Sequence, residues 1–284
     1  MYFRTDLADE ARELSKGEAQ EIDGVKADTE VKEELKVTTV EVLNEKGEKA
    51  IGKAIGKYIT IEVPDIKYST EAYESACHTV AEEIGKLCDI KSSTLTLVVG
   101  LGNENITPDS LGTRTVSEIM VTHHMKMHAP ELFGDNVSSV CAIAPGVMGT
   151  TGMETAEVVK SIVERLKPDL VIVIDALAAA DISRIGITLQ ISDAGIQPGA
   201  GVGNNRSGIS KKELGVPVIA MGVPTVVDAM TFTRDNSDTK NEPLVVTPRD
   251  IDTIIKKCAK TISGGINMAL QKGMSLREIE EYVG

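Results

Sequence analysis

Short apolar runs alternate with amphipathic segments along most of the chain. Runs that are apolar throughout predict buried strands at 94–99, 137–144, 170–174, 185–191 and 216–221. Apolar residues that recur at helical spacing predict helices at 7–19, 72–87, 111–127, 155–166, 248–270 and 275–282. Strict alternation of apolar and polar residues predicts half-exposed strands at 35–42 and 57–63.

This order of elements predicts an α/β fold. Strands that are apolar on both faces and alternate with helices are typical of a mostly parallel sheet covered by helices on both faces. No linker rich in Pro, Gly or Ser divides the chain, so we expect one domain over residues 7–284. In such sheets, functional sites form where the strands end at their carboxyl termini.

Two aspartates follow apolar strands at that edge of the predicted sheet. Asp109 lies in the loop after the 94–99 strand, and Asp175 follows the 170–174 strand directly. Two carboxylates that face each other cannot easily both ionise, so one serves as acid while the other serves as base. Such a pair can hydrolyse peptides. Alternatively, Asp109 caps a helix that begins near Leu111, and Asp175 caps a helix over the alanine-rich residues 176–180.

The sequence gives weaker support to other kinds of functional site. Gly100-Leu101-Gly102 lacks the third glycine of a dinucleotide loop, and the glycine-rich stretch 198–206 lacks the ending of a phosphate loop. His124 and His128 share a helix face, so a metal site is conceivable, but no third ligand is evident. Cys141 lies within an apolar strand, where we expect it to pack in the core.

Composition limits the classes of binding partner and the cellular compartment that we expect for this protein. The chain has 284 residues, a net charge of −13 and a pI of about 4.9, which disfavours direct binding to nucleic acid. Neither a signal peptide nor an apolar run long enough for a membrane helix is present. The scattered cysteines suggest reduced thiols, so we expect a cytoplasmic, soluble protein.

Several segments together resemble the germination proteases. They are 98–103, 105–112, 145–149, 174–178, 190–193, 201–204 and 222–229. Each is short, but together they are specific, and the resemblance runs from the N-terminus to about residue 230.

The resemblance implies a function and an assembly. Germination proteases degrade small acid-soluble spore proteins when a bacterial spore germinates, and they are similar in fold to the hydrogenase-maturation endopeptidases. They are made as zymogens, assemble as homotetramers and are thought to be atypical aspartic peptidases. The carboxylates implicated in the family fall on Asp109 and Asp175 here. We therefore expect an endopeptidase of the spore core that needs neither a metal nor another cofactor.

The N-terminus resembles a processing site of that family. In the cleavage sites of that family, an acidic residue is followed by an aliphatic residue and then by alanine. Thr5-Asp6-Leu7-Ala8 resembles such a site, because Asp6, Leu7 and Ala8 have this order. We expect residues 1–6 to be a propeptide that the enzyme removes by cutting between Asp6 and Leu7; alternatively, the terminus is simply frayed. A metal-dependent maturation-type peptidase and a non-enzymatic scaffold on the same fold are the competing functions.

Overall fold

The structure of the chain is a computed structural model. It describes residues 5–16, 21–64, 66–129, 137–198, 207–229 and 244–283. The glycine-rich residues 199–206 lie outside this part of the chain, as do residues 1–4 of the expected propeptide.

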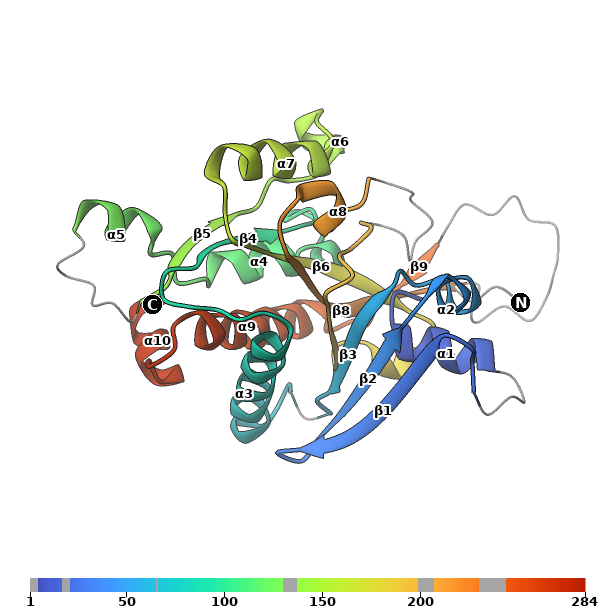
Figure 1. Cartoon of the computed structure of the whole chain (residues 1–284). Coiled ribbons are helices and arrows are strands. Elements are labelled where there is room, and N and C mark those ends of the chain that lie inside the picture. The colour runs from blue at the N-terminus through green and yellow to red at the C-terminus, as the bar shows by residue number, and fades with distance from the viewer. Residues whose placement is uncertain are drawn as a thin grey trace.

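The described strands join into a nine-stranded sheet that runs through the molecule (Figure 1). Its strands are β1 (Val25–Lys32), β2 (Leu35–Val42), β3 (Gly56–Glu62), β4 (Leu95–Gly100), β5 (Ser139–Ile143), β6 (Leu170–Ala179), β7 (Thr188–Ser192), β8 (Val218–Asp228) and β9 (Val245–Val246). Their spatial order is β1-β2-β3-β7-β8-β6-β4-β5, and β9 pairs with β8.

The expected α/β class is confirmed, with one correction to the strand directions. Strands β5, β4, β6 and β8 run parallel, as expected for strands connected by helices. The remaining pairs are all antiparallel, so the sheet is mixed rather than mostly parallel. For β1 and β2 the reason is that only Glu33 and Glu34 connect them, and so short a connection allows only an antiparallel pair.

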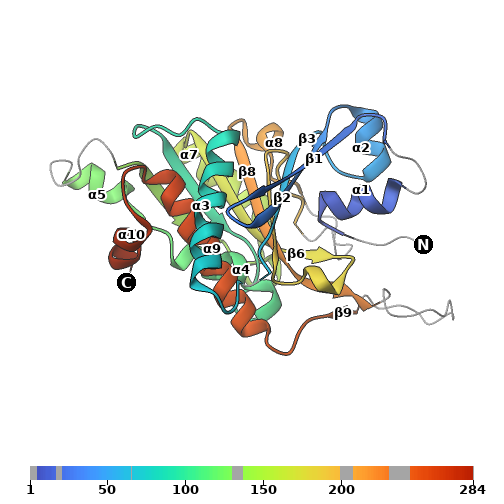
Figure 2. The same ribbon diagram turned by 90° about the horizontal axis from the view of Figure 1, so that it is seen from below.

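Helices cover both faces of the sheet (Figures 1 and 2). On one face lie α3 (Thr70–Leu87), α4 (Leu111–Ser117) and α9 (Ile251–Leu270), with α10 (Leu276–Val283) beside α9. Their apolar side chains join residues such as Ile61 and Ile172 in the largest buried cluster. On the other face, α7 (Thr155–Leu166) covers the parallel strands, and α1 (Ala8–Lys16) and α2 (Glu45–Ile51) cover β2 and β3.

The remaining described helices are short. They are α5 (His123–His128), α6 (Met148–Thr151) and α8 (Lys211–Leu214), with single 3-10 turns η1 (Thr107–Asp109) and η3 (Ile182–Arg184).

One expected helix, and one helix that belonged to the alternative interpretation of Asp175, differ from the structure. The helix expected over 111–127 is interrupted, because Asn267 accepts from the Met120 amide and the buried Thr122 hydroxyl bonds to Ser138 and Val140 of the neighbouring strand. The alternative helix over 176–180 does not form, because β6 continues to Ala179 and pairs with β8 up to that residue, with one register shift. Tertiary pairing here overrides the helical propensity of alanine.

Candidate active site

Parallel pairing brings the two predicted aspartates to one edge of the sheet. Gly100, the last residue of β4, lies opposite Ile174 of β6, and the Leu101 amide donates to the Ile174 carbonyl at 2.8 Å. Asp175 of β6 therefore lies beside the point where β4 ends and where the loop that carries Asp109 leaves the sheet.

The loop after β4 folds back so that Asp109 returns to that edge. The Asn103 amide donates to the Asp109 carboxylate at 2.8 Å and to the Asp109 carbonyl at 3.1 Å. Gly102 has a φ of +101°, and a Cβ there would lie 1.9 Å from the Asp109 carbonyl oxygen. Glycine is therefore required for this close approach.

A second glycine fixes the helix that follows. A Cβ on Gly112 of α4 would lie 2.4 Å from the Leu101 carbonyl oxygen and 2.5 Å from that of Ile174. The helix consequently rests directly on the ends of β4 and β6, and the loop that carries Asp109 is held between them.

Asp109 and Asp175 border the same pocket, which has a volume of about 330 Å³. Its other described lining is mostly apolar: Leu101, Gly102, Ile106, Pro108, Val147, Thr155, Ala176, Leu177, Ala178, Pro198, Thr225, Val226 and Val245, with Asp6 at its side. Asp175 is only 6 % exposed, and its carboxylate accepts from the Ala176 amide at 2.9 Å. Two carboxylates at a small, largely apolar cavity can divide the roles of acid and base between them.

Neither aspartate caps a helix as the alternative interpretation required. Ser110 is the residue that precedes α4, and no side chain caps that helix. Asp175 lies within β6, two residues before a register shift in its pairing with β8. Such an irregularity changes where the neighbouring side chains point.

The N-terminal segment lies against the same pocket. The Asp6 amide donates to the Ala178 carbonyl, and the Ala178 amide donates to the Asp6 carboxylate, both at 2.8 Å. The Gln190 amide donates to the Asp6 carbonyl at 3.1 Å and accepts from the Ala8 amide at 2.7 Å. Leu7, between them, is fully buried. The bond between Asp6 and Leu7 is thus held by contacts to β6 and β7, and Asp6 lies at the side of the pocket that the two aspartates border.

Charged groups surround this segment. The Glu10 carboxylate accepts from the amides of Ala180 and Asp181, at 2.8 and 3.0 Å. The Lys53 ammonium donates to the Thr5 carbonyl at 2.8 Å. Burial lowers the pKa of Lys53, while the negative charges of Asp6 and Glu10 act in the opposite direction.

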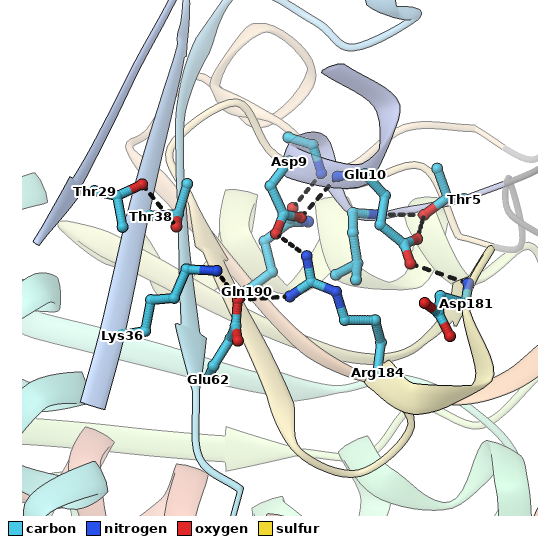
Figure 3. A network of polar contacts seen from close by, with 12 residues as sticks. Thr5, Asp9, Glu10, Thr29, Lys36, Thr38, Glu62, Asp181, Arg184 and Gln190 are labelled. Carbon is cyan, nitrogen blue, oxygen red and sulfur yellow. Dashed lines mark hydrogen bonds and ion pairs between the residues drawn. The ribbon is translucent and has the colours of Figure 1, made fainter. Parts of the chain in front are cut away.

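Arg184 anchors the helix that follows the segment (Figure 3). Its guanidinium lies between Asp9 of α1, at 2.5 Å, and Glu62 of β3, at 3.0 Å. Asp9 is 5 % exposed, so this ion pair is largely buried. The pair joins the N-terminal helix to the antiparallel part of the sheet.

Sequence reasoning missed Lys53, Arg184 and the role of Gln190. The sequence did offer a signal for Gln190, because this polar residue stands between the apolar residues Leu189 and Ile191. In the structure it is 7 % exposed. Lys53 and Arg184 are single basic residues in charged or loop segments, and nothing in their spacing marks them.

The other candidates lie apart from this pocket. Among the described residues, no three His, Cys, Asp or Glu side chains are placed to hold a metal ion together. Cys141 is half-buried rather than in the core and lines a separate cavity of about 940 Å³, where burial raises the pKa of its thiol. No helix in the described part of the chain is long and apolar enough to cross a membrane.

The fold and this pocket define an α/β protein whose cavity presents two carboxylates, one from within β6 and one from the loop after β4. Sequence comparison specifies it further: the germination protease family matches residues 4–241. The germination protease of Clostridium perfringens strain SM101 is 45 % identical over 320 aligned positions, covering 99 % of this chain and 98 % of that protein. That of Caldanaerobacter subterraneus subsp. tengcongensis is 46 % identical, with 99 % and 98 % covered.

The chain belongs to the germination protease family. It is accordingly a hydrolase, an endopeptidase of spore germination. Among solved structures, the [NiFe] hydrogenase maturation protease HycI from Thermococcus kodakarensis is similar over 64 % of this chain and 96 % of its own. The TM-score of this match is 0.37, and the sequence identity is 18 %.

Proposed function

We propose that this endopeptidase works as an atypical aspartic peptidase with Asp109 and Asp175 as its paired carboxylates. The observation that carries the proposal is that both residues, Asp175 within β6 and Asp109 in the loop after β4, border one pocket of about 330 Å³. Family membership supplies the peptidase activity, and the pocket is where a peptide bond can meet both side chains.

The reaction requires one carboxylate to be ionised and the other protonated. The ionised carboxylate takes a proton from a water molecule as its oxygen attacks the peptide carbonyl carbon. The protonated carboxylic acid donates its proton to the carbonyl oxygen, which would otherwise carry the negative charge. When the carbon–nitrogen bond breaks, the departing amine takes up the proton that the first carboxylate took from the water molecule. A hydroxyl of the intermediate returns its proton to the second carboxylate, and the other product is a carboxylic acid.

We propose small acid-soluble spore proteins as the substrates, cleaved after Glu or Asp and before an aliphatic residue and Ala. The chain's own Asp6-Leu7-Ala8 has this order and lies beside the pocket. With a net charge of −13 the enzyme would be repelled by DNA, so it would act on substrate that has left the DNA.

We further propose that the enzyme is a zymogen that cuts itself between Asp6 and Leu7. In the present conformation Leu7 is fully buried and Asp6 is paired with Ala178, so the bond is covered on both sides. Release of the segment would therefore have to precede processing. Assembly as a homotetramer in the spore core is part of the same proposal, and analytical ultracentrifugation of the full chain would test the assembly.

Cleavage of a defined peptide tests the mechanism. A protein that starts at Leu7 and its Asp175→Asn variant would be incubated with a peptide that contains Glu, Leu and Ala in sequence, and the products read by mass spectrometry. Asp169→Asn is the matched control, because Asp169 lies at the opposite end of β6 and accepts from the Leu95 amide, which an asparagine also permits.

We expect cleavage after Glu by the parent and by Asp169→Asn, and a loss of at least about 1,000-fold in Asp175→Asn. Equal cleavage by Asp175→Asn would remove this residue from the mechanism. Sensitivity to a chelator would favour the metal-dependent alternative on the same fold, and no cleavage by any of the proteins would favour a scaffold.

A further inference from the structure

A polar slot beside the catalytic pocket is filled by the chain's own N-terminal segment. The slot is formed by the backbone of Ala178 at the end of β6, by Gln190 of β7 and by Lys53 after α2. It opens into a second cavity of about 490 Å³, which shares Asp6 and Leu177 with the pocket of the two aspartates.

Two kinds of contact hold the segment. The first kind involves only its backbone: Gln190 bonds to the carbonyl of Asp6 and the amide of Ala8, and the Ala178 carbonyl accepts from the Asp6 amide. These contacts would hold any extended peptide, since every residue except proline offers the same groups.

The second kind involves the acidic side chain. The Asp6 carboxylate accepts from the Ala178 amide at 2.8 Å, and the half-buried Lys53 ammonium is held one residue away, where it donates to the Thr5 carbonyl at 2.8 Å. A backbone amide bound to the carboxylate, with an ammonium group held at the adjacent residue, favours a negative charge in the slot. The Glu10 carboxylate, although close to Lys53, is already bound to two backbone amides.

We propose that this slot is the subsite that binds the acidic side chain of peptide substrates, with Lys53 as the specificity-determining residue and Gln190 as the residue that aligns the backbone. This inference rests on the proposed endopeptidase function. In a substrate, the residue after the acidic one would enter the apolar part of the 330 Å³ pocket, near Ile106 and Val245.

The chain's own segment fills this slot, with its Asp6 carbonyl bonded to Gln190 at 3.1 Å and its Asp6 carboxylate bonded to the Ala178 amide at 2.8 Å. A peptide substrate can therefore enter the slot only after the segment has left it.

Peptide binding to the full chain tests the slot. In Asp6→Lys, the new ammonium repels Lys53 and cannot accept from the Ala178 amide, so the segment leaves the slot and the Ala178 amide exchanges faster. Fluorescence anisotropy then compares two labelled peptides, one with Glu before Leu and Ala and one with Gln in place of Glu.

We expect Asp6→Lys to bind the Glu peptide at least about tenfold more tightly than the Gln peptide. Adding Lys53→Met should reduce the ratio of the two affinities to about one, with little change in the affinity for the Gln peptide. Adding Gln190→Ala should instead weaken the binding of both peptides alike. Lys212→Met is the matched control, because Lys212 lines the same second cavity but belongs to α8; its ratio should stay unchanged. Thermal unfolding would verify that each variant is folded.

Equal affinity of Asp6→Lys for both peptides, or an equal loss of discrimination in Lys212→Met, would overturn the assignment of Lys53. An Ala178 amide that stays protected in Asp6→Lys would overturn it too, because the slot would then hold the segment without reading its charge. Cleavage assayed in parallel separates the two proposals. Tighter binding of the Glu peptide without cleavage supports the slot and counts against the proposed mechanism. Cleavage with equal binding of the two peptides supports the mechanism and counts against the slot.

Discussion

At the scale of single residues, the position of Asp109 depends on a glycine that carries no chemistry. A methyl group on Gly112 would meet two carbonyl oxygens within 2.5 Å, so α4 would have to move away from β4 and β6. We expect Gly112→Ala to cost roughly 1–3 kcal/mol and to lower peptidase activity. Gly85→Ala is the control: Gly85 lies in α3 with nothing within 4 Å of its added Cβ, and should gain roughly 0.5–1 kcal/mol. Urea unfolding of both variants measures the difference.

A half-buried carboxyl far from the pocket gives a prediction about pH. Burial raises the pKa of Glu118, against the hydrogen bond from Ser263 and the nearby lysines. The folded state therefore binds this proton more tightly than the unfolded state, and stability falls as the pH rises through the raised pKa. Glu118→Gln should be more stable than the parent at neutral pH, on the order of 0.5 kcal/mol, and should lose that advantage near pH 4. Unfolding curves at both pH values decide this; an equal difference at both would refute it.

At the scale of elements, the docking of α1 depends on a buried ion pair. Arg184→Met would leave the nearly buried Asp9 carboxylate without its guanidinium, and Glu62 would keep only Lys36. We expect a loss of about 3 kcal/mol in the protection of α1 amides from hydrogen exchange. Lys36→Met removes only an exposed partner of Glu62 and should change protection by less than about 0.5 kcal/mol. Similar protection in both variants would mean that α1 is held by its apolar contacts alone.

The strands also show which parts of the structure could be predicted from the sequence. Apolar strands that end at Gly100 and before Asp175 were enough to predict that Asp109 and Asp175 follow neighbouring strands, and the structure brings both to one pocket. The extension of β6 to Ala179 was not predictable, because it depends on pairing with β8 rather than on alanine's own preference. Strand β1 was missed because its residues are almost all exposed, so no alternation marks it.

At the scale of the whole molecule, one apolar cluster connects the two halves of the sheet. It includes Ile61 of the antiparallel strands and Ile172 of the parallel ones. If residues 7–284 are one domain, Ile61→Ala should lower the stability of the entire chain by roughly 2–5 kcal/mol. Hydrogen exchange of amides in β2 and β4 should then accelerate together, with a single urea transition. Acceleration confined to β2 would show that the halves unfold separately.

The proposed processing site rests on a short sequence pattern, but its surroundings could not be predicted from the sequence. The order of Asp6, Leu7 and Ala8 is visible in the sequence, whereas Gln190 reaches this segment from a position more than 180 residues away. Contacts between such distant positions follow from the sheet order, in which β7 lies between β3 and β8.

The hydroxyl of Thr5 has a consequence for the mature enzyme. It accepts from the Leu7 amide at 3.0 Å and donates to the Glu10 carboxylate at 2.5 Å. Cleavage between Asp6 and Leu7 would remove this hydroxyl and turn the Leu7 amide into a primary ammonium group at a buried position. A buried charge is tolerated only with a counter-ion, and Glu10 is the one that this geometry offers. Cutting one peptide bond would thus create a salt bridge at the new amino terminus, which would hold the shortened chain in its cut form.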